Sequence, residues 1–174
     1  YEDIIRFAEL GVIPSMQATH ATSDKNMAED RLGPVRIQGA YAWRKLLDSG
    51  ARIANGSDFP VEHPNPFYGL HASVTRQDQQ SKPAGGWYGE ERMTLEEALA
   101  SFTIDAAYAG HQEAHLGTLE PGKKADFILL DRDIFTQPPT QMWQTQVQET
   151  WVDGVRVSVL SLIHISEPTR PFHI

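Results

Sequence analysis

The chain contains no cysteine. This absence excludes a disulfide framework and any metal site built on thiolates. No apolar run approaches the about 20 residues that a membrane-spanning helix needs. Basic residues are scarce: 15 lysines and arginines stand against 23 aspartates and glutamates, giving a net charge of 15 − 23 = −8. Because phosphate binding depends on lysine and arginine charge, this balance argues against a nucleic-acid partner or an anionic membrane.

What remains is the composition of a folded protein, with 40% hydrophobic and 22% charged residues among 174. That length suits one domain or pieces of two. The sequence holds no glycine-rich phosphate loop and no Gly-x-Ser-x-Gly elbow. Nucleotide phosphate binding and serine-hydrolase chemistry therefore have no support.

The first part of the chain alternates between helical and strand patterns. Helices are expected over residues 2–10 and 38–49, short strands over 12–16 and 52–55, and loops over 17–24 and 25–36. This order is typical of βα units in a parallel sheet or a barrel.

Further helices and then a β segment follow. A helix is expected over residues 67–76, and Thr94 with Glu97 forms a capping box that begins a helix ending near residue 102. A second helix begins near residue 103. From residue 117 the pattern changes to strands, around residues 125–131 and on both sides of the hairpin signal Asp153-Gly154.

Asp58 and His20 are the residues that point to chemistry. Asp58 lies where the strand at 52–55 ends, and its carboxylate there is suited to binding a divalent metal or accepting a proton from water. Gly56 before it permits close backbone approach or an unusual φ. If the strands at 12–16 and 52–55 are adjacent and parallel, His20 opens onto the same rim as Asp58. The alternatives, a turn aspartate and an exposed loop histidine, stay open on spacing alone.

The other histidines carry weaker signals. His63 lies in a proline-rich loop and is expected at the surface, and His71 is expected to be structural or exposed. His111 and His115 stand four residues apart but near a helix end, where a charge effect on the helix terminus is the simpler role.

These motifs, taken in order, resemble the C-terminal portion of an amidohydrolase-superfamily protein of the YtcJ-like, amidohydrolase-3 type, a group that includes N-substituted formamide deformylases. The segment from Gly11 to Gln17 with His20 and Asp24 resembles the family's seventh strand and its loop, and Gly56-Ser57-Asp58-Phe59-Pro60 resembles its eighth. The runs 72–76, 94–99, 103–108 and 117–126 follow in the family's order.

The resemblance implies an α/β fold: the last two strands and helices of a (β/α)₈ barrel, plus part of a small β-sandwich. We accordingly expect residues 1–116 to belong to the barrel and residues 117–157 to the sandwich. Residues 160–170 resemble the translated read-through of a sequencing adapter, so residues 158–174 are expected to be a non-native tail.

The resemblance also implies an activity. It implies hydrolysis of carbon–nitrogen bonds other than peptide bonds by metal-activated water, with zinc as the usual divalent metal. Asp58 corresponds to a metal ligand that shuttles the proton, and His20 to a residue that contacts a small amide-type substrate. Asp24 and Arg76 match recurring positions without an assignable role.

This chain departs from the family pattern because it lacks the His-x-His motif and the other metal ligands, so we expect it to be inactive alone.

Two alternatives stay open: a deaminase or cyclic-amide hydrolase of the same superfamily, and a non-catalytic remnant or interaction module. The cytoplasm is favoured as the compartment, and any N-terminal targeting region would lie outside this chain.

Overall fold

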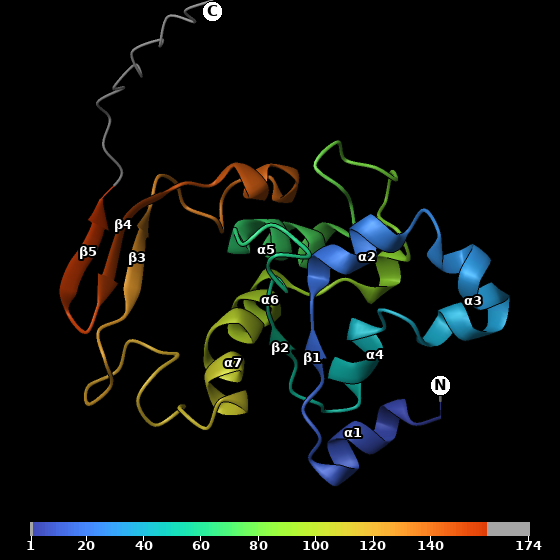
Figure 1. Cartoon of the computed structure of the whole chain (residues 1–174), viewed down its shortest axis with the longest axis horizontal. Helices are drawn as coiled ribbons and strands as arrows, with labels where there is room; N and C mark the ends of the chain where they lie inside the picture. The colour runs from blue at the N-terminus through green and yellow to red at the C-terminus, as the bar shows by residue number, and fades with distance from the viewer. Residues whose placement is uncertain (1, 160–174) are drawn as a thin grey trace, which may run out of the picture.

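The computed structural model describes residues 2–159. Its elements in chain order are α1 (Ile4–Leu10), β1 (Ser15–Met16), α2 (Ala18–Asp24), α3 (Ala28–Arg36), η1 (Ile37–Gly39), α4 (Trp43–Asp48), β2 (Ala54–Asn55), α5 (Pro66–Thr75), η2 (Gly89–Glu91), α6 (Leu95–Phe102), α7 (Ile104–Ala109), β3 (Phe127–Leu130), η3 (Pro139–Gln144), β4 (Val147–Val152) and β5 (Val155–Val159). The chain is therefore mixed α/β, with most helices gathered around β1 and β2 and a separate sheet of β3, β4 and β5 at one end (Figure 1).

The two short strands of the first part pair in parallel, with Ser15 opposite Ala54 and Met16 opposite Asn55. This confirms the predicted adjacency of the two strand segments. The strands are shorter than expected, because residues 12–14 and 52–53 precede the paired positions without strand geometry.

Several helix ends form as their residues dictate. The Thr94 hydroxyl accepts the amide N–H of Glu97, and the Glu97 carboxylate accepts that of Thr94, so the capping box is confirmed. At α5, the Asn65 side chain accepts the amide of Phe67 and Pro66 occupies the first turn. Gly11 ends α1 with a left-handed φ of 67°.

Two segments expected to be loops are helical instead. Residues 18–24 form α2, and residues 28–36 form α3, which bends at Gly33-Pro34 where Gly33 leaves the helical region with φ 74°. α2 buries Ala18, Thr19 and Ala21, so tertiary packing outweighs the low helix propensity of its threonines.

A continuous apolar core lies beneath the helices of the first part. Trp43 and Ile53 are fully buried, and Phe67 and Leu70 of α5 pack into the same cluster. Met142 of η3, from the β segment, belongs to that cluster as well. The segment 117–157, expected to form a separate part, therefore contributes η3 to the core of the first part.

The second sheet is antiparallel in the order β3–β4–β5. β4 and β5 are joined at Asp153 and Gly154, both with positive φ, which confirms the predicted hairpin. β5 includes Ser158 and Val159, the first two residues of the expected tail. Residues 160–174, the remainder of that tail, lie outside the described residues.

Candidate functional site

The parallel pairing of β1 and β2 brings the C-terminal ends of both strands to one edge. α2 begins immediately after β1, and the loop that carries Asp58 begins immediately after β2. In parallel α/β folds, ligands and chemistry gather at this edge of the strands. The local order of elements therefore places α2 and the Asp58 loop side by side.

His20 and Asp58 meet at this edge. The His20 Nε2 atom lies 3.5 Å from the Asp58 Oδ2 atom, with the histidine side chain 25% exposed and the aspartate 49% exposed. His20 Nε2 is buried and has no hydrogen-bond partner among residues 2–159. The expected shared rim is confirmed, but His20 lies on a helix and not in the loop that we expected over residues 17–24.

Asp58 itself has the unusual backbone conformation at this edge, with φ 59°. Gly56, where the sequence predicted conformational freedom, is not among the residues with positive φ, and a Cβ atom there would meet nothing within 4 Å. Aspartate adopts this conformation more readily than most residues, and six other non-glycine residues among those described share a positive φ. The conformation is therefore a feature of the turn after β2 and does not by itself mark a functional residue.

Asn55, at the end of β2, connects the two halves of the site. Its Oδ1 accepts the amide N–H of Ala18 and that of Gly56, both at 3.2 Å. Its Nδ2 donates to the Ser101 hydroxyl at 3.4 Å. One buried amide thus fixes the first residue of the His20 helix against the loop that leads to Asp58.

Asp24 and Arg76, which had no role from the sequence, belong to one buried network. The Tyr41 hydroxyl donates to Asp24 at 2.7 Å, and Arg76 Nη1 donates to the Tyr41 carbonyl at 2.9 Å. The Arg76 guanidinium, fully buried, lies 4.3 Å from the ring centre of Trp43 and 5.3 Å from that of Trp87. The network ties the C-terminal end of α2 to the end of α5.

Burial governs the protonation of this network. It raises the pKa of Tyr41 to about 12, assisted by the bond to Asp24, and lowers the pKa of Arg76 to about 10. Both groups therefore keep their protons at neutral pH, so the network serves to hold α2 in place.

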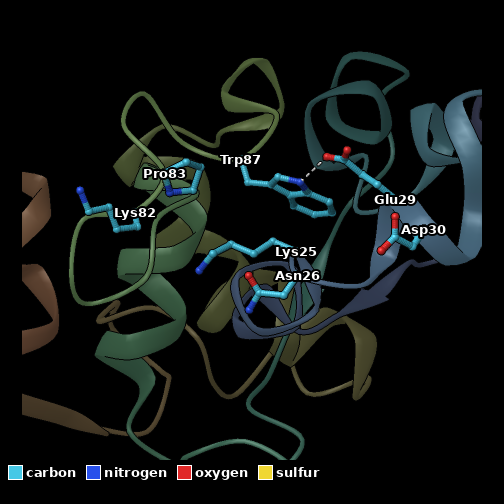
Figure 2. Close-up of a pocket in the computed structure, with 7 residues that line it drawn as sticks. All are labelled: Lys25, Asn26, Glu29, Asp30, Lys82, Pro83 and Trp87. Carbon is cyan, nitrogen blue, oxygen red and sulfur yellow. Dashed lines mark hydrogen bonds between the residues drawn. The ribbon is translucent and has the colours of Figure 1, made fainter.

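An open cavity of about 430 Å³ lies beside the end of α2 (Figure 2). Trp87 forms one wall and donates from Nε1 to Glu29 at 3.0 Å, the dashed line in the figure. Lys25 and Lys82 lie on one side of the cavity, and Glu29 and Asp30 on the other. The acidic and basic groups oppose each other across it, so it favours neither ionic sign.

The other histidines among residues 2–159 do not join His20. His63, His111 and His115 are exposed, as expected for His63. His71 is only 2% exposed and lies within α5, which agrees with a structural placement.

The donor atoms at the site are incomplete for a metal. A carboxylate at a strand end and a neutral imidazole are suitable ligands, but a zinc site needs three protein ligands. Within residues 2–159, no cluster of three or more histidine, aspartate or glutamate side chains is arranged to hold a metal ion. The described residues alone therefore do not fit a resident zinc ion. No helix among them is long and apolar enough to span a membrane.

The parallel β1–β2 pair, the helices around it and the edge that carries His20 and Asp58 define an α/β protein with polar side chains at the C-terminal ends of its strands. The family model described as "Amidohydrolase family" matches residues 1–158, and the chain therefore belongs to the amidohydrolase family.

Three relatives illustrate the match. The chain is 36% identical over 150 residues to Protein LONG AFTER FAR-RED 3 of Arabidopsis thaliana, covering 86% of this chain and 25% of that protein. It is 29% identical over 153 residues to Putative amidohydrolase YtcJ of Bacillus subtilis (88% and 29%), and 33% identical over 112 residues to N-substituted formamide deformylase of Arthrobacter pascens (64% and 20%). The chain thus spans between a fifth and a third of these relatives.

Among solved structures, an uncharacterised metal-dependent hydrolase from Pyrococcus horikoshii superposes with a TM-score of 0.70 at 27% identity. The match covers 79% of this chain and 28% of that one. The resemblance to the amidohydrolase superfamily that the motifs predicted is confirmed.

Sequence reasoning missed Asn55 and the network around Arg76. Asn55 carries no catalytic motif of its own, although its position at the end of a strand beside Gly56-Ser57-Asp58 was visible. Arg76 was singled out as a recurring position, but the sequence carried no signal for its burial or its bond to the Tyr41 carbonyl.

Proposed function

We propose that this chain is the C-terminal part of a metal-dependent amidohydrolase that cleaves carbon–nitrogen bonds other than peptide bonds in small amide-type molecules, such as N-substituted formamides. β1 and β2 would then be the last two strands of a (β/α)₈ barrel, and β3–β5 part of its β-sandwich. The observation that carries the proposal is the approach of His20 to Asp58 at the shared strand edge, in a chain that matches the family over residues 1–158.

Asp58 would bind the metal and move the proton. Its carboxylate is half exposed at the strand end, so it is accessible from the edge. A divalent metal, most commonly zinc in such enzymes, would supply activated water. The Asp58 carboxylate would accept a proton from that water and deliver it to the leaving nitrogen.

His20 would contact the substrate. Its Nε2 atom lies 3.5 Å from the Asp58 Oδ2 atom, so a substrate that approaches this carboxylate would come beside the His20 ring. Asn55, which bonds the amides of Ala18 and Gly56, would keep the helix of His20 and the loop of Asp58 at a fixed separation.

The experiment uses the complete protein encoded at the source locus and, in parallel, this chain alone. We expect the complete protein to hydrolyse an N-substituted formamide and to bind zinc stoichiometrically, and this chain alone to do neither. Asp58→Asn should lower kcat by about 10³-fold or more, and His20→Gln should mainly raise KM. Asp30→Asn and His111→Gln, exposed residues away from the edge, are the matched controls.

The substrate panel separates the alternatives. Turnover of cyclic amides or of an amino-substituted ring in place of formamides would favour the cyclic-amide hydrolase or deaminase of the same superfamily. A complete protein with no hydrolysis of any C–N substrate, or full activity in Asp58→Asn, would contradict the proposal.

A further inference from the structure

The end of β2 carries an Asn-Gly sequence, Asn55-Gly56, two residues before Asp58. In such a pair the backbone nitrogen of the glycine can attack the asparagine side-chain amide, because the glycine has no side chain to obstruct ring closure. The other asparagines of the chain, Asn26 and Asn65, precede a bulky methionine and a proline that has no N–H. The sequence therefore makes Asn55 the most reactive of the three towards loss of its side-chain nitrogen.

The structure places the reacting groups next to each other. The Gly56 backbone nitrogen lies 3.2 Å from Asn55 Oδ1, so the attacking atom is beside the amide that it would attack. The Ala18 amide N–H also donates to this Oδ1 atom at 3.2 Å. The oxygen gains negative charge when the side-chain carbon is attacked, and a fixed donor at this position stabilises that charge.

Other contacts of the same residues restrain the reaction. The Gly56 N–H also donates to the Met16 carbonyl at 3.1 Å, and the nitrogen must lose this hydrogen before it can attack. Asn55 is 9% exposed, and its Nδ2 atom donates to the Ser101 hydroxyl at 3.4 Å. β1 and β2 pair over two residues each, so opening this edge is a small local event that does not require global unfolding.

We propose that Asn55 is a site of spontaneous deamidation that reacts when the β1–β2 edge opens. The Gly56 nitrogen gives its proton to hydroxide and forms a bond to the Asn55 side-chain carbon. The bond from that carbon to Nδ2 then breaks, and Nδ2 leaves as ammonia after taking a proton from water. Water adds to either carbonyl carbon of the resulting succinimide and opens it to aspartate or isoaspartate. This modification does not depend on the proposed hydrolase activity.

Both products weaken the link between the helix of His20 and the loop of Asp58. Aspartate at this position loses the donor to Ser101 and places a negative charge in a buried site. Isoaspartate carries the main chain through the former side chain, which lengthens the backbone ahead of Asp58 and removes the side-chain acceptor of the Ala18 amide. Deamidation therefore releases α2 from the end of β2.

The test incubates the 174-residue chain in mildly alkaline buffer, with a parallel sample unfolded in urea. Peptide mass spectrometry measures, at each asparagine, the mass gained when NH₂ is replaced by OH. We expect Asn55 to react in both samples and ahead of Asn26 and Asn65. The folded chain should react about 10-fold to 10³-fold more slowly than the unfolded one, because a few hydrogen bonds must break before the Gly56 nitrogen is released.

Matched variants assign the mechanism. Gly56→Ala should slow the modification at least about tenfold in both samples, because a side chain restricts the backbone conformations that ring closure needs. The substitution fits the fold, since a Cβ there would meet nothing within 4 Å. Gly110→Ala, where a Cβ meets ordinary contacts at 3.6 Å, is the control and should leave the rate at Asn55 unchanged. If Gly56→Ala does not fold, its sample in urea still provides the comparison.

The consequence is tested with Asn55→Asp, which reproduces one product. Amide hydrogen exchange in α2 should become about tenfold faster than in the parent, with β4 unchanged. Four results would overturn the proposal: equal rates in the folded and unfolded chains, a folded chain slower by more than about 10³-fold, undiminished modification in Gly56→Ala, or unchanged exchange of α2 in Asn55→Asp.

Discussion

The part of the chain up to residue 116 and the β segment after it bury their side chains very differently. In the first part, Trp43 and Ile53 are fully buried, and even charged Arg76 and Glu91 lie inside the protein. In the sheet of β3–β5, no residue of the three strands is fully buried, and all of β5 is exposed. Ile128 and Leu129 are 42% and 47% exposed although neighbouring strand residues point to opposite faces, so both faces of β3 are open within the described chain.

The comparison shows where the β segment is held. Its buried residues, Ile134, Met142 and Thr145, all lie between β3 and β4 and not in the strands. η3 packs on α5, and Trp143 meets Tyr68 of α5 edge to face at 6.5 Å. The sheet is thus attached through its connection, and its strands are stabilised mainly by one another.

The largest expected loss of stability is found by replacing one tryptophan with alanine in each of the two regions. Trp43→Ala should lower the free energy of unfolding by about 3–5 kcal/mol because it empties a fully enclosed site. Trp151→Ala should cost only about 1 kcal/mol, since its ring is partly exposed, stacks on Phe127 at 5.4 Å and donates one bond to the Glu149 carboxylate. Urea unfolding measures both, and equal losses would show that the sheet is packed as tightly as the core.

Acid should affect the first region before the second. Burial lowers the pKa of His71 from 6.5 to about 4. Between these two pH values the histidine is therefore protonated in the unfolded chain and neutral in the folded chain. Stability is therefore complete above pH 6.5 and falls as the pH drops to 4, by at most about 3 kcal/mol.

Urea unfolding at several pH values tests this, with His71→Gln as the variant that should flatten the curve between pH 4 and 6.5. Amide exchange should quicken in α5 and not in β4. The pKa values of Asp78 and Glu97 are lowered from ordinary values of 3.8 and 4.5, so the loss of their contributions begins near those values and continues as the pH falls further. If the free energy of unfolding still falls between pH 6.5 and 4 in His71→Gln, a group other than His71 takes up the proton.

Asn55→Ala sharpens the comparison at the site. It leaves the amides of Ala18 and Gly56 without their acceptor, and we expect a loss of about 1–3 kcal/mol. Ser101→Ala removes the 3.4 Å contact to Asn55 and the hydroxyl's own bond to the Ala98 carbonyl at 2.7 Å, and should cost about 1 kcal/mol. In Asn55→Ala, amide hydrogen exchange should become faster in α2 and remain unchanged in β3–β5. Faster exchange across all described elements would mean that Asn55 stabilises the whole fold.

The smallest effect concerns the helix cap. Thr94→Ala should lower stability by about 1 kcal/mol because the amide of Glu97 loses its acceptor. Thr150→Ala, a β4 residue opposite Ser158, is the control and should cost about 0.2–0.5 kcal/mol. A larger loss at Thr150 than at Thr94 would reverse the expected order of the two regions.

Local signals predicted the fold where neighbouring residues determine the structure. The Thr94–Glu97 box and the Asp153-Gly154 hairpin are complete within a few residues, and both formed as expected. α2 was missed because the acceptor for its first amide is Asn55, which lies 37 residues further along the chain.

The site was predictable only in part for the same reason. Adjacency of two strands was enough to bring His20 near Asp58, and the family resemblance supplied their proposed roles. The contacts of Asn55 were not predictable, because hydrogen bonds between distant residues have no sequence pattern. The burial of Arg76 between Trp43 and Trp87 was likewise not predictable, because these tryptophans are distant from it in the sequence.

The parallel pairing of β1 with β2 also has a kinetic consequence. Ser15 and Ala54 are 39 positions apart, so closing the chain between them costs about 3 kcal/mol of loop entropy. Only two pairs of residues then form strand hydrogen bonds that offset this cost. Contacts within and between neighbouring helices involve far shorter loops and form sooner. We therefore expect the edge where His20 meets Asp58 to be assembled late in folding, after the helices between the two strands have brought them together.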